Sequence, residues 1–199
     1  MPEDMKFELR REMFHLVFGI LTVLGLLMLG RNAMLWLLFS LIIAGILFSL
    51  AILRYRPKFM KWPLKRFERP KFISTFPGKG LLFFMAGSMI VIKLFSPDIA
   101  IASITILTFG DSVSHLVGIS VKGRKMIHKS KNIEGTIAGA IVAFIASSIF
   151  VPIAYAAIAS LGAMIAESIT VSLGGDNVDD NLIVPVAAGA ILYFLFRLF

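Results

Sequence analysis

A few acidic side chains in this sequence occupy positions where a charge is costly, and they are the first candidates for chemistry. Asp111 and Glu167 each interrupt a long apolar run, and Glu167 is the one charged residue in the 41 positions from 135 to 175. A carboxylate in such surroundings needs a partner or an aqueous cavity. Together with Glu134 and Asp180, these residues form a predicted set of oxygen ligands for Mg²⁺ or another divalent cation.

Small and basic residues are densest between positions 110 and 136. Small residues let backbone amides approach a polyphosphate, and cations neutralise it, so this segment is a candidate nucleotide-binding loop. The alternative is that the glycines permit close helix packing and the cations anchor lipid. Residue types alone leave both interpretations open. The small and cationic members concerned are Gly110, Ser112, Gly118, Gly123, Lys129, Lys131 and Gly135.

Several common classes of site are excluded by composition and motif. The chain has no cysteine, so it has no disulfide, thiolate nucleophile or cysteine-bound metal. A Walker loop is absent, as is the signature of soluble protein kinases. Chemistry must therefore rest on carboxylates, three histidines, hydroxyls and basic groups. Of the histidines, His15 is spaced four residues from both Arg11 and Gly19, so the three share one helix face.

The elements that must position these residues are membrane helices. Of the 199 residues 58% are hydrophobic and 16% charged, and the mean hydropathy is +0.88, which excludes an ordinary soluble domain. About 20 residues are needed for a helix to cross a bilayer. The chain is predicted to be a single all-α transmembrane domain, 1–199, with about seven transmembrane helices. The predicted spans are 13–30, 32–53, 80–95, 99–120, two within 135–175 that break at Val151-Pro152, and 181–199.

The distribution of basic residues predicts the orientation. With the N-terminus in the cytoplasm, three basic residues before position 12, nine in the basic cytoplasmic loop 54–79 and five at 122–131 face inward, which is 17 of 20. The net charge of +8 favours anionic lipid head groups as partners over nucleic acid. We expect an integral protein of the plasma membrane or endoplasmic reticulum, with its active site facing the cytoplasm.

Five blocks of residues, in order along the chain, resemble the membrane-embedded polyprenol kinase family, which includes dolichol kinase, phytol kinase and a CTP-dependent diacylglycerol kinase. The blocks extend from Glu8 to Pro185. They are Glu8-x-Arg10-Arg11-x-x-x-His15-x-x-x-Gly19, Gly110-Asp111-Ser112 with Gly118, Lys131-Asn132-Ile133-Glu134-Gly135-Thr136, Glu167, and Asp180-Asn181-Leu182 before Pro185.

The resemblance implies a CTP-dependent kinase that transfers the γ-phosphate to the hydroxyl of a polyprenol-like or dolichol-like isoprenoid. It implies Mg²⁺ as cofactor and the segment 110–136 as the nucleotide-binding loop. It also implies catalytic roles for Asp111, Glu134, Glu167 and His15. Nucleotide contacts are expected from Arg11, Asn181 and either Lys129 or Lys131.

Two further functions remain as alternatives. A phosphatidate cytidylyltransferase-like enzyme would also use CTP, but those enzymes usually carry a Gly-His-Gly-Gly block near the C-terminus, and neither His nor Gly-Gly follows Pro185 here. A small ion or solute transporter would also hold acids in its membrane helices, near the midplane and within an internal repeat. The kinase hypothesis instead requires the acids to meet at the inner interface.

Overall fold

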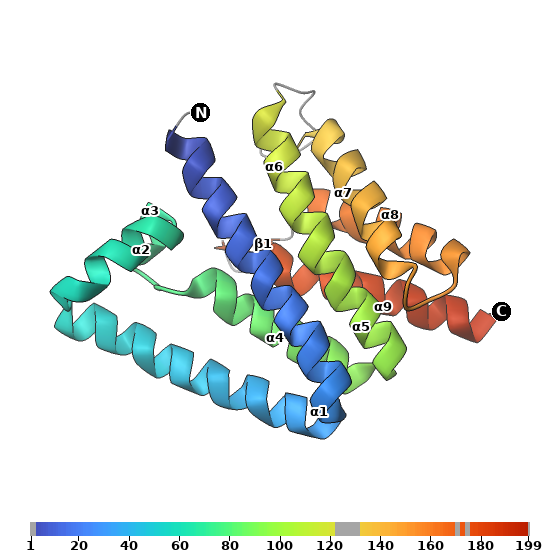
Figure 1. Cartoon of the computed structure of the whole chain (residues 1–199), viewed down its shortest axis with the longest axis horizontal. Helices are drawn as coiled ribbons and strands as arrows, with labels where there is room; N and C mark the ends of the chain where they lie inside the picture. Colours follow the sequence, from blue (N-terminus) through green and yellow to red (C-terminus); the bar gives the residue numbers. More distant parts are fainter. Residues whose placement is uncertain (1–2, 122–131, 170–171, 174–175, 199) are drawn as a thin grey trace.

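The computed structural model describes residues 3–121, 132–169, 172–173 and 176–198. The regular elements of the described chain are helices except for one pair of two-residue strands, and the helices pack side by side (Figure 1). The elements are α1 (Glu3–Tyr55), η1 (Lys58–Met60), α2 (Lys61–Phe67), α3 (Pro70–Ile73), α4 (Lys79–Leu94), α5 (Pro97–Thr105), η2 (Ile106–Asp111), α6 (Ser112–Ser120), α7 (Ile133–Ser147), α8 (Ile153–Ser168), β1 (Ser172–Leu173), β2 (Asp176–Asn177) and α9 (Asp180–Leu198).

Helix α1 consists of two arms joined at Gly30. Gly30 has φ 77° and ψ 171°, a conformation that glycine adopts at low cost because it has no Cβ. The bend lies at the opposite end of the molecule from the N-terminus (Figure 1). Next to the bend, the Arg31 guanidinium donates to the carbonyl of Lys93 at the end of α4. The predicted helical hairpin is therefore confirmed as two helical arms.

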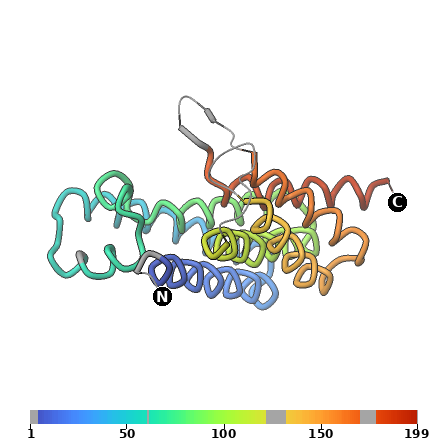
Figure 2. The backbone as a smooth tube through the Cα atoms, turned by 90° about the horizontal axis from the view of Figure 1, so that it is seen from above, coloured from blue at the N-terminus to red at the C-terminus, as the bar shows by residue number. Residues whose placement is uncertain are grey.

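The basic loop 54–79 is folded into three short helices, η1, α2 and α3. In the view from above, these helices and the C-terminal end of α9 lie at opposite ends of the molecule (Figure 2). The Glu68 carboxylate fixes the turn that follows α2, since it accepts hydrogen bonds from the backbone N–H groups of Arg69 at 3.1 Å and Gly78 at 2.6 Å. The basic residues are thus presented on a folded segment beside the start of α1 (Figure 1).

The predicted stretch 99–120 is one rod built from α5, η2 and α6. Pro97 occupies the first turn of α5, where its missing N–H costs nothing. The middle section, η2, is a π-helical turn, and its residues Ile106 and Leu107 are fully buried. Turns of this kind are frequent at functional sites, and Asp111 is the last residue of this one.

Helices α7 and α8 follow one another with the predicted break at Val151-Pro152, and Pro152 is the N-cap of α8. After α8, β1 and β2 form one antiparallel pair in which Ser172 faces Asn177 and Leu173 faces Asp176. Helix α9 then packs against α8, α4 and α5. This arrangement brings the end of α8 and the start of α9 to the same region.

Three described helical stretches are long and apolar enough to cross a membrane by length and composition, namely Met5–Tyr55, Pro97–Ser120 and Asp180–Leu198. Helices α7 and α8 are apolar but shorter. Large apolar side chains face outward along the molecule, including Met28 and Trp36, which are 82% and 70% exposed. The chain is accordingly a helical protein suited to a membrane, and its crossing seven times stays a prediction.

Candidate functional site

The central feature of the site is a group of three carboxylates, which we call the acidic cluster: Asp111, Glu167 and Asp180. One carboxylate oxygen from each lies within 4.8 Å of the others. Asp111 ends η2, Glu167 is the penultimate residue of α8, and Asp180 begins α9. Glu167 is 3% exposed. Three of the four predicted metal ligands therefore meet, although they come from three separate elements.

Glutamate 134, the fourth predicted ligand, lies outside the acidic cluster. It is in the first turn of α7 and is half-buried. That turn is held against α6 because Gly135 approaches α6 closely: a Cβ built on Gly135 would lie 2.5 Å from the Ser114 carbonyl oxygen and 3.2 Å from the Gly118 Cα. The position of Glu134 thus follows from the contact of α7 with α6, and its role as a metal ligand stays a prediction.

Close helix contacts also account for Gly110. A Cβ built there would lie 2.7 Å from the Met164 sulfur and 3.2 Å from the Ala143 Cβ, so α7 and α8 approach η2 only because the side chain is absent. The packing interpretation of these glycines therefore applies to Gly110 and Gly135. Their packing brings Asp111 beside the end of α8.

The candidate nucleotide-binding loop 110–136 is partly helical. Ser112–Ser120 forms α6, and α7 begins at Ile133. The Asn132 side-chain amide donates to the carbonyl oxygens of Gly118 at 2.6 Å and Val121 at 3.2 Å, so the residues on either side of the segment 122–131 lie together. Gly123, Lys129 and Lys131 lie outside the described residues, and their predicted phosphate contacts stay predictions.

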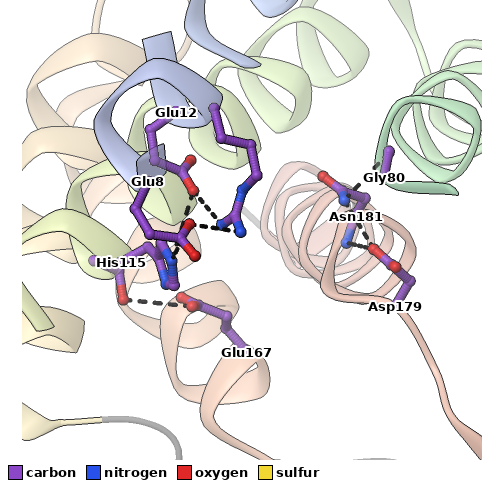
Figure 3. A network of polar contacts seen from close by, with 9 residues as sticks. Glu8, Glu12, Gly80, His115, Glu167, Asp179 and Asn181 are labelled. Carbon is purple, nitrogen blue, oxygen red and sulfur yellow. Dashed lines mark hydrogen bonds and ion pairs between the residues drawn. The ribbon is translucent and has the colours of Figure 1, made fainter. Parts of the chain in front are cut away.

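One serine of α6 contacts the acidic cluster, and another follows Asp111 directly in the sequence. The Ser114 hydroxyl donates to Glu167 Oε1 at 3.4 Å, a bond drawn in Figure 3. Ser112 is fully buried, and among the described residues its hydroxyl has no hydrogen-bond partner. Ser112, the residue after Asp111, therefore has a buried hydroxyl with unused bonding capacity.

Asn181 adds an amide oxygen to this region. Its Nδ2 donates to Asp179 Oδ1 at 2.8 Å and to the Gly80 carbonyl oxygen at 3.4 Å (Figure 3). Because both of those atoms are acceptors, the amide orientation is set by the network. Its Oδ1 is shielded from solvent and accepts no hydrogen bond from any described residue. Asn181 thus has a shielded oxygen with unused bonding capacity, and its predicted nucleotide contact stays a prediction.

A second polar group, the N-terminal network, consists of Glu8, Arg11, Glu12 and His115. The Arg11 guanidinium contacts Glu8 Oε2 at 2.6 Å and Glu12 Oε1 at 2.5 Å. The His115 Nε2 lies 3.0 Å from Glu8 Oε2 and 3.9 Å from Glu12 Oε1. This network ties the first turns of α1 to α6, as the labelled side chains in Figure 3 show.

The N-terminal network engages Arg11, one of the predicted nucleotide contacts, and His115. Arg11, expected to bind phosphate, already shares its charge between two carboxylates. His115, which follows Asp111 by four residues along the same rod, is engaged by Glu8. Glu8, Glu12 and His115 have the spacing of a metal site, but the Arg11 cation in their midst supplies the positive charge and repels a metal ion.

Glu12 was not among the predicted site residues, and it is only 2% exposed. A sequence signal for it exists, since Glu8 and Glu12 are four residues apart with Arg11 between them. Residues at this spacing share a helix face. The burial of Glu12, however, depends on the packing of α1 against distant helices.

His15 and Gly19 continue the same face of α1. The His15 ring packs edge-on against Phe84 with ring centroids 4.9 Å apart, and its Nε2 is shielded and bonded to no described residue. Gly19 abuts Thr108 of η2, where a side chain would collide with the threonine. The predicted face from Arg11 to Gly19 thus contacts the rod that carries Asp111. His15 is a shielded polar group that belongs to neither the acidic cluster nor the N-terminal network.

Comparison with known proteins gives one relative. The chain is 29% identical to an uncharacterized protein of Methanocaldococcus jannaschii over 187 residues, which cover 93% of this chain and 92% of the relative. No family model matches the sequence. No solved structure matches it either. The two chains are therefore similar along nearly their whole lengths.

Proposed function

We propose that this protein is a CTP-dependent lipid-alcohol kinase, which transfers the γ-phosphate to the hydroxyl of a polyprenol-like or dolichol-like isoprenoid. The observation that carries the proposal is the acidic cluster, in which oxygens of Asp111, Glu167 and Asp180 lie within 4.8 Å of one another. The motifs that resemble the polyprenol kinase family contain all three residues. Convergence of these distant motif residues is what a shared site requires.

The donor set fits a hard divalent cation such as Mg²⁺. Carboxylate oxygens, like those that Asp111, Glu167 and Asp180 bring together, are the ligands that Mg²⁺ and Ca²⁺ prefer. Carboxylates held this close repel one another, so cation binding offsets their repulsion. A bound Mg²⁺ would neutralise charge on the β and γ phosphates of the nucleotide.

The residues of the chain would then bind and orient the reactants. In phosphoryl transfer the alcohol oxygen bonds to the γ-phosphorus, the bond to the β-phosphate oxygen breaks and CDP leaves. The alcohol proton passes to a carboxylate or to water. We assign phosphate binding to Lys129 or Lys131 and assign Glu134, at the start of α7, to the nucleotide side of the site. Arg11 acts through Glu8 and Glu12 as a positioning residue.

An apolar groove offers a path for the isoprenoid tail. It has a volume of about 230 Å³ and is lined by residues of α1, α5, η2, α7 and the turn after α7, among them Gly19, Leu27, Thr108 and Phe150. Thr108 lies three residues before Asp111, which is less than one helical turn. A tail in this groove would place its hydroxyl end near the acidic cluster while the chain stays among apolar side chains.

The orientation that we propose puts the acidic cluster at the cytoplasmic interface, with the N-terminus inside and seven crossings. Two of the three carboxylates support a site at one end of the helices, since Glu167 is one residue from the end of α8 and Asp180 begins α9. A transporter site would lie near the midplane. Seen this way, the protein is an integral enzyme of the plasma membrane or endoplasmic reticulum.

The test is a transfer assay on the purified full chain in detergent with a polyprenol, Mg²⁺ and CTP labelled at either the α or the γ phosphorus. We expect label in the lipid from γ-labelled CTP alone. Label from α-labelled CTP would instead identify a cytidylyltransferase, and no label in any lipid alcohol would overturn both. The Asp111→Asn variant should lose transfer, whereas Asp98→Asn, a matched change of an exposed acid in α5, should keep it.

A further inference from the structure

A second site is suggested by a groove between the first turns of α1 and the short helices α2 and α3. Its volume is about 790 Å³. Six basic side chains from two separate parts of the chain line it, and we call it the basic groove. These residues are Lys6, Arg10, Lys65, Arg66, Arg69 and Lys71.

The described acids balance the charge of the basic groove only in part, because Glu8 and Glu68 interact electrostatically with Arg69 alone among its cations. None of its six basic side chains forms an ion pair with an acid within the part of the chain that the structure describes. Glu8, which also lines the groove, is engaged by Arg11 and His115. Like charges gathered around one concavity repel one another, and bound anions remove that repulsion.

Two of the cations are ordered by aromatic rings without being neutralised. The Arg66 guanidinium lies 5.1 Å from the centroid of the Trp62 ring, and the Lys71 ammonium lies 5.7 Å from that of Phe72. Such contacts hold a side chain in place while its charge remains available. Arg10 adds a donor, because its Nε is shielded from solvent and hydrogen bonds to no described residue.

The neighbourhood matches the level of lipid head groups. Phe59 and Trp62 are 76% and 66% exposed on the same basic segment. Exposed aromatic rings beside Lys and Arg are typical of segments at a membrane interface. Guanidinium and ammonium groups together form the usual binding set for phosphate, the guanidinium through paired hydrogen bonds and the ammonium as a point charge.

We infer that the basic groove binds a phosphate-bearing anion, at a site separate from the acidic cluster. The phosphate can be carried by the head group of an anionic phospholipid or by a soluble polyphosphate, and the two sources present the same chemistry to the groove. The inference stands independently of the proposed kinase activity.

The experiment uses the full chain with Trp36 changed to phenylalanine, so that Trp62, next to the groove, is the single tryptophan. In one arm, mixed micelles carry phosphatidylglycerol with brominated acyl chains, which quench nearby tryptophan, and brominated phosphatidylcholine is the neutral reference. In the other arm, inorganic tripolyphosphate is titrated calorimetrically into protein in detergent. We expect saturable binding in at least one arm. Binding in the micelle arm identifies a lipid head group as the source of the phosphate, and binding in the calorimetric arm identifies a soluble polyphosphate.

The groove variant carries Arg10→Gln, Lys65→Gln and Arg69→Gln together. The matched control carries Arg54→Gln, Arg56→Gln and Lys58→Gln, three exposed basic residues of the same segment that do not line the groove.

Both triple variants remove three charges, so the control measures the general attraction of the segment to anions. We expect the groove variant to bind about tenfold more weakly than the control variant. Equal weakening in the two variants would overturn the inference, as would the absence of saturable binding in both arms. Thermal unfolding of each variant checks that its fold is retained.

Discussion

The acidic cluster and the N-terminal network have the same spacing of candidate ligand atoms but different chemistry. In both groups three side chains offer ligand atoms within 4.8 Å of one another. The network includes the Arg11 cation within 2.6 Å of two of its carboxylates, whereas the acidic cluster consists of carboxylates from three elements. Distance alone therefore does not define a metal site, because the charge of the groups within it decides what it binds.

The largest effect is expected for Glu167→Gln, which removes one charge from the acidic cluster. We expect lipid phosphorylation to fall about 100-fold to 1,000-fold, the size of losses seen when a group stabilising transition-state charge is removed. Initial rates in the detergent assay measure this loss. Glu134→Gln is the comparison, since Glu134 lies outside the cluster, and an equal loss in both variants would mean that four carboxylates act together.

Breaking the N-terminal network should chiefly affect stability. Arg11→Gln leaves Glu12 buried without its cation, and breaking a buried ion pair costs about 3 kcal/mol or more. Denaturation in mixed micelles measures the change in unfolding free energy. The double variant Arg11→Gln with Glu12→Gln should recover part of the lost unfolding free energy, because the buried charge of Glu12 is then gone. If the double variant is no more stable than Arg11→Gln alone, the pair is not coupled as described.

The contact between α1 and η2 holds the N-terminal network and the acidic cluster in place relative to each other. A methyl group at Gly19 would collide with Thr108, so Gly19→Ala should destabilise the protein by about 1 to 3 kcal/mol through overpacking. Gly80→Ala is the matched control, because a Cβ built there meets no atom within 4 Å outside its own helical turn. Thermal unfolding of the two variants measures the difference, and equal melting temperatures would contradict the close contact.

The smallest expected effect concerns Glu68, at the turn after α2. Burial raises the pKa of Glu68 above its ordinary value of 4.5, against the lowering effect of hydrogen bonds from the N–H groups of Gly78 and Arg69. The folded state thus binds the proton more tightly than the unfolded state. Its contribution to stability is fully present below pH 4.5 and is lost as the pH rises through the raised pKa.

Unfolding measured across this pH range checks that prediction. The decline in stability with rising pH should be shallower in Glu68→Gln than in the parent protein, because glutamine does not titrate. An unchanged slope would show that Glu68 has its ordinary pKa. Because Glu68 is one partly exposed group, the change in unfolding free energy is expected to be a fraction of that caused by Arg11→Gln.

The parts of the fold that depend on local sequence could be predicted. Gly30 marks the bend of α1 and Pro152 the start of α8, because a glycine with positive φ and a proline without an N–H act on their own turn. Asp111 and Glu167 could also be selected from sequence, since an isolated carboxylate in an apolar run has few structural explanations.

The parts of the fold that depend on packing between distant elements could not be predicted from the sequence. The contact of His115 with Glu8 joins residues 107 apart and exists only because α1 packs against α6. The place of Glu134 likewise depends on the close contact of Gly135 with Ser114, which sets where the first turn of α7 lies. Ordinary sequence spacing carries no information about either contact.

The most direct test of the central claim is a titration of the detergent-solubilised protein with Mn²⁺, a paramagnetic substitute for Mg²⁺, followed by electron paramagnetic resonance. Asp180→Asn changes the acidic cluster and Glu12→Gln changes the N-terminal network by one charge each. We predict that the parent protein binds Mn²⁺ saturably, that Asp180→Asn weakens binding about tenfold or more, and that Glu12→Gln leaves it nearly unchanged. Binding that survives Asp180→Asn but is lost in Glu12→Gln would contradict the account.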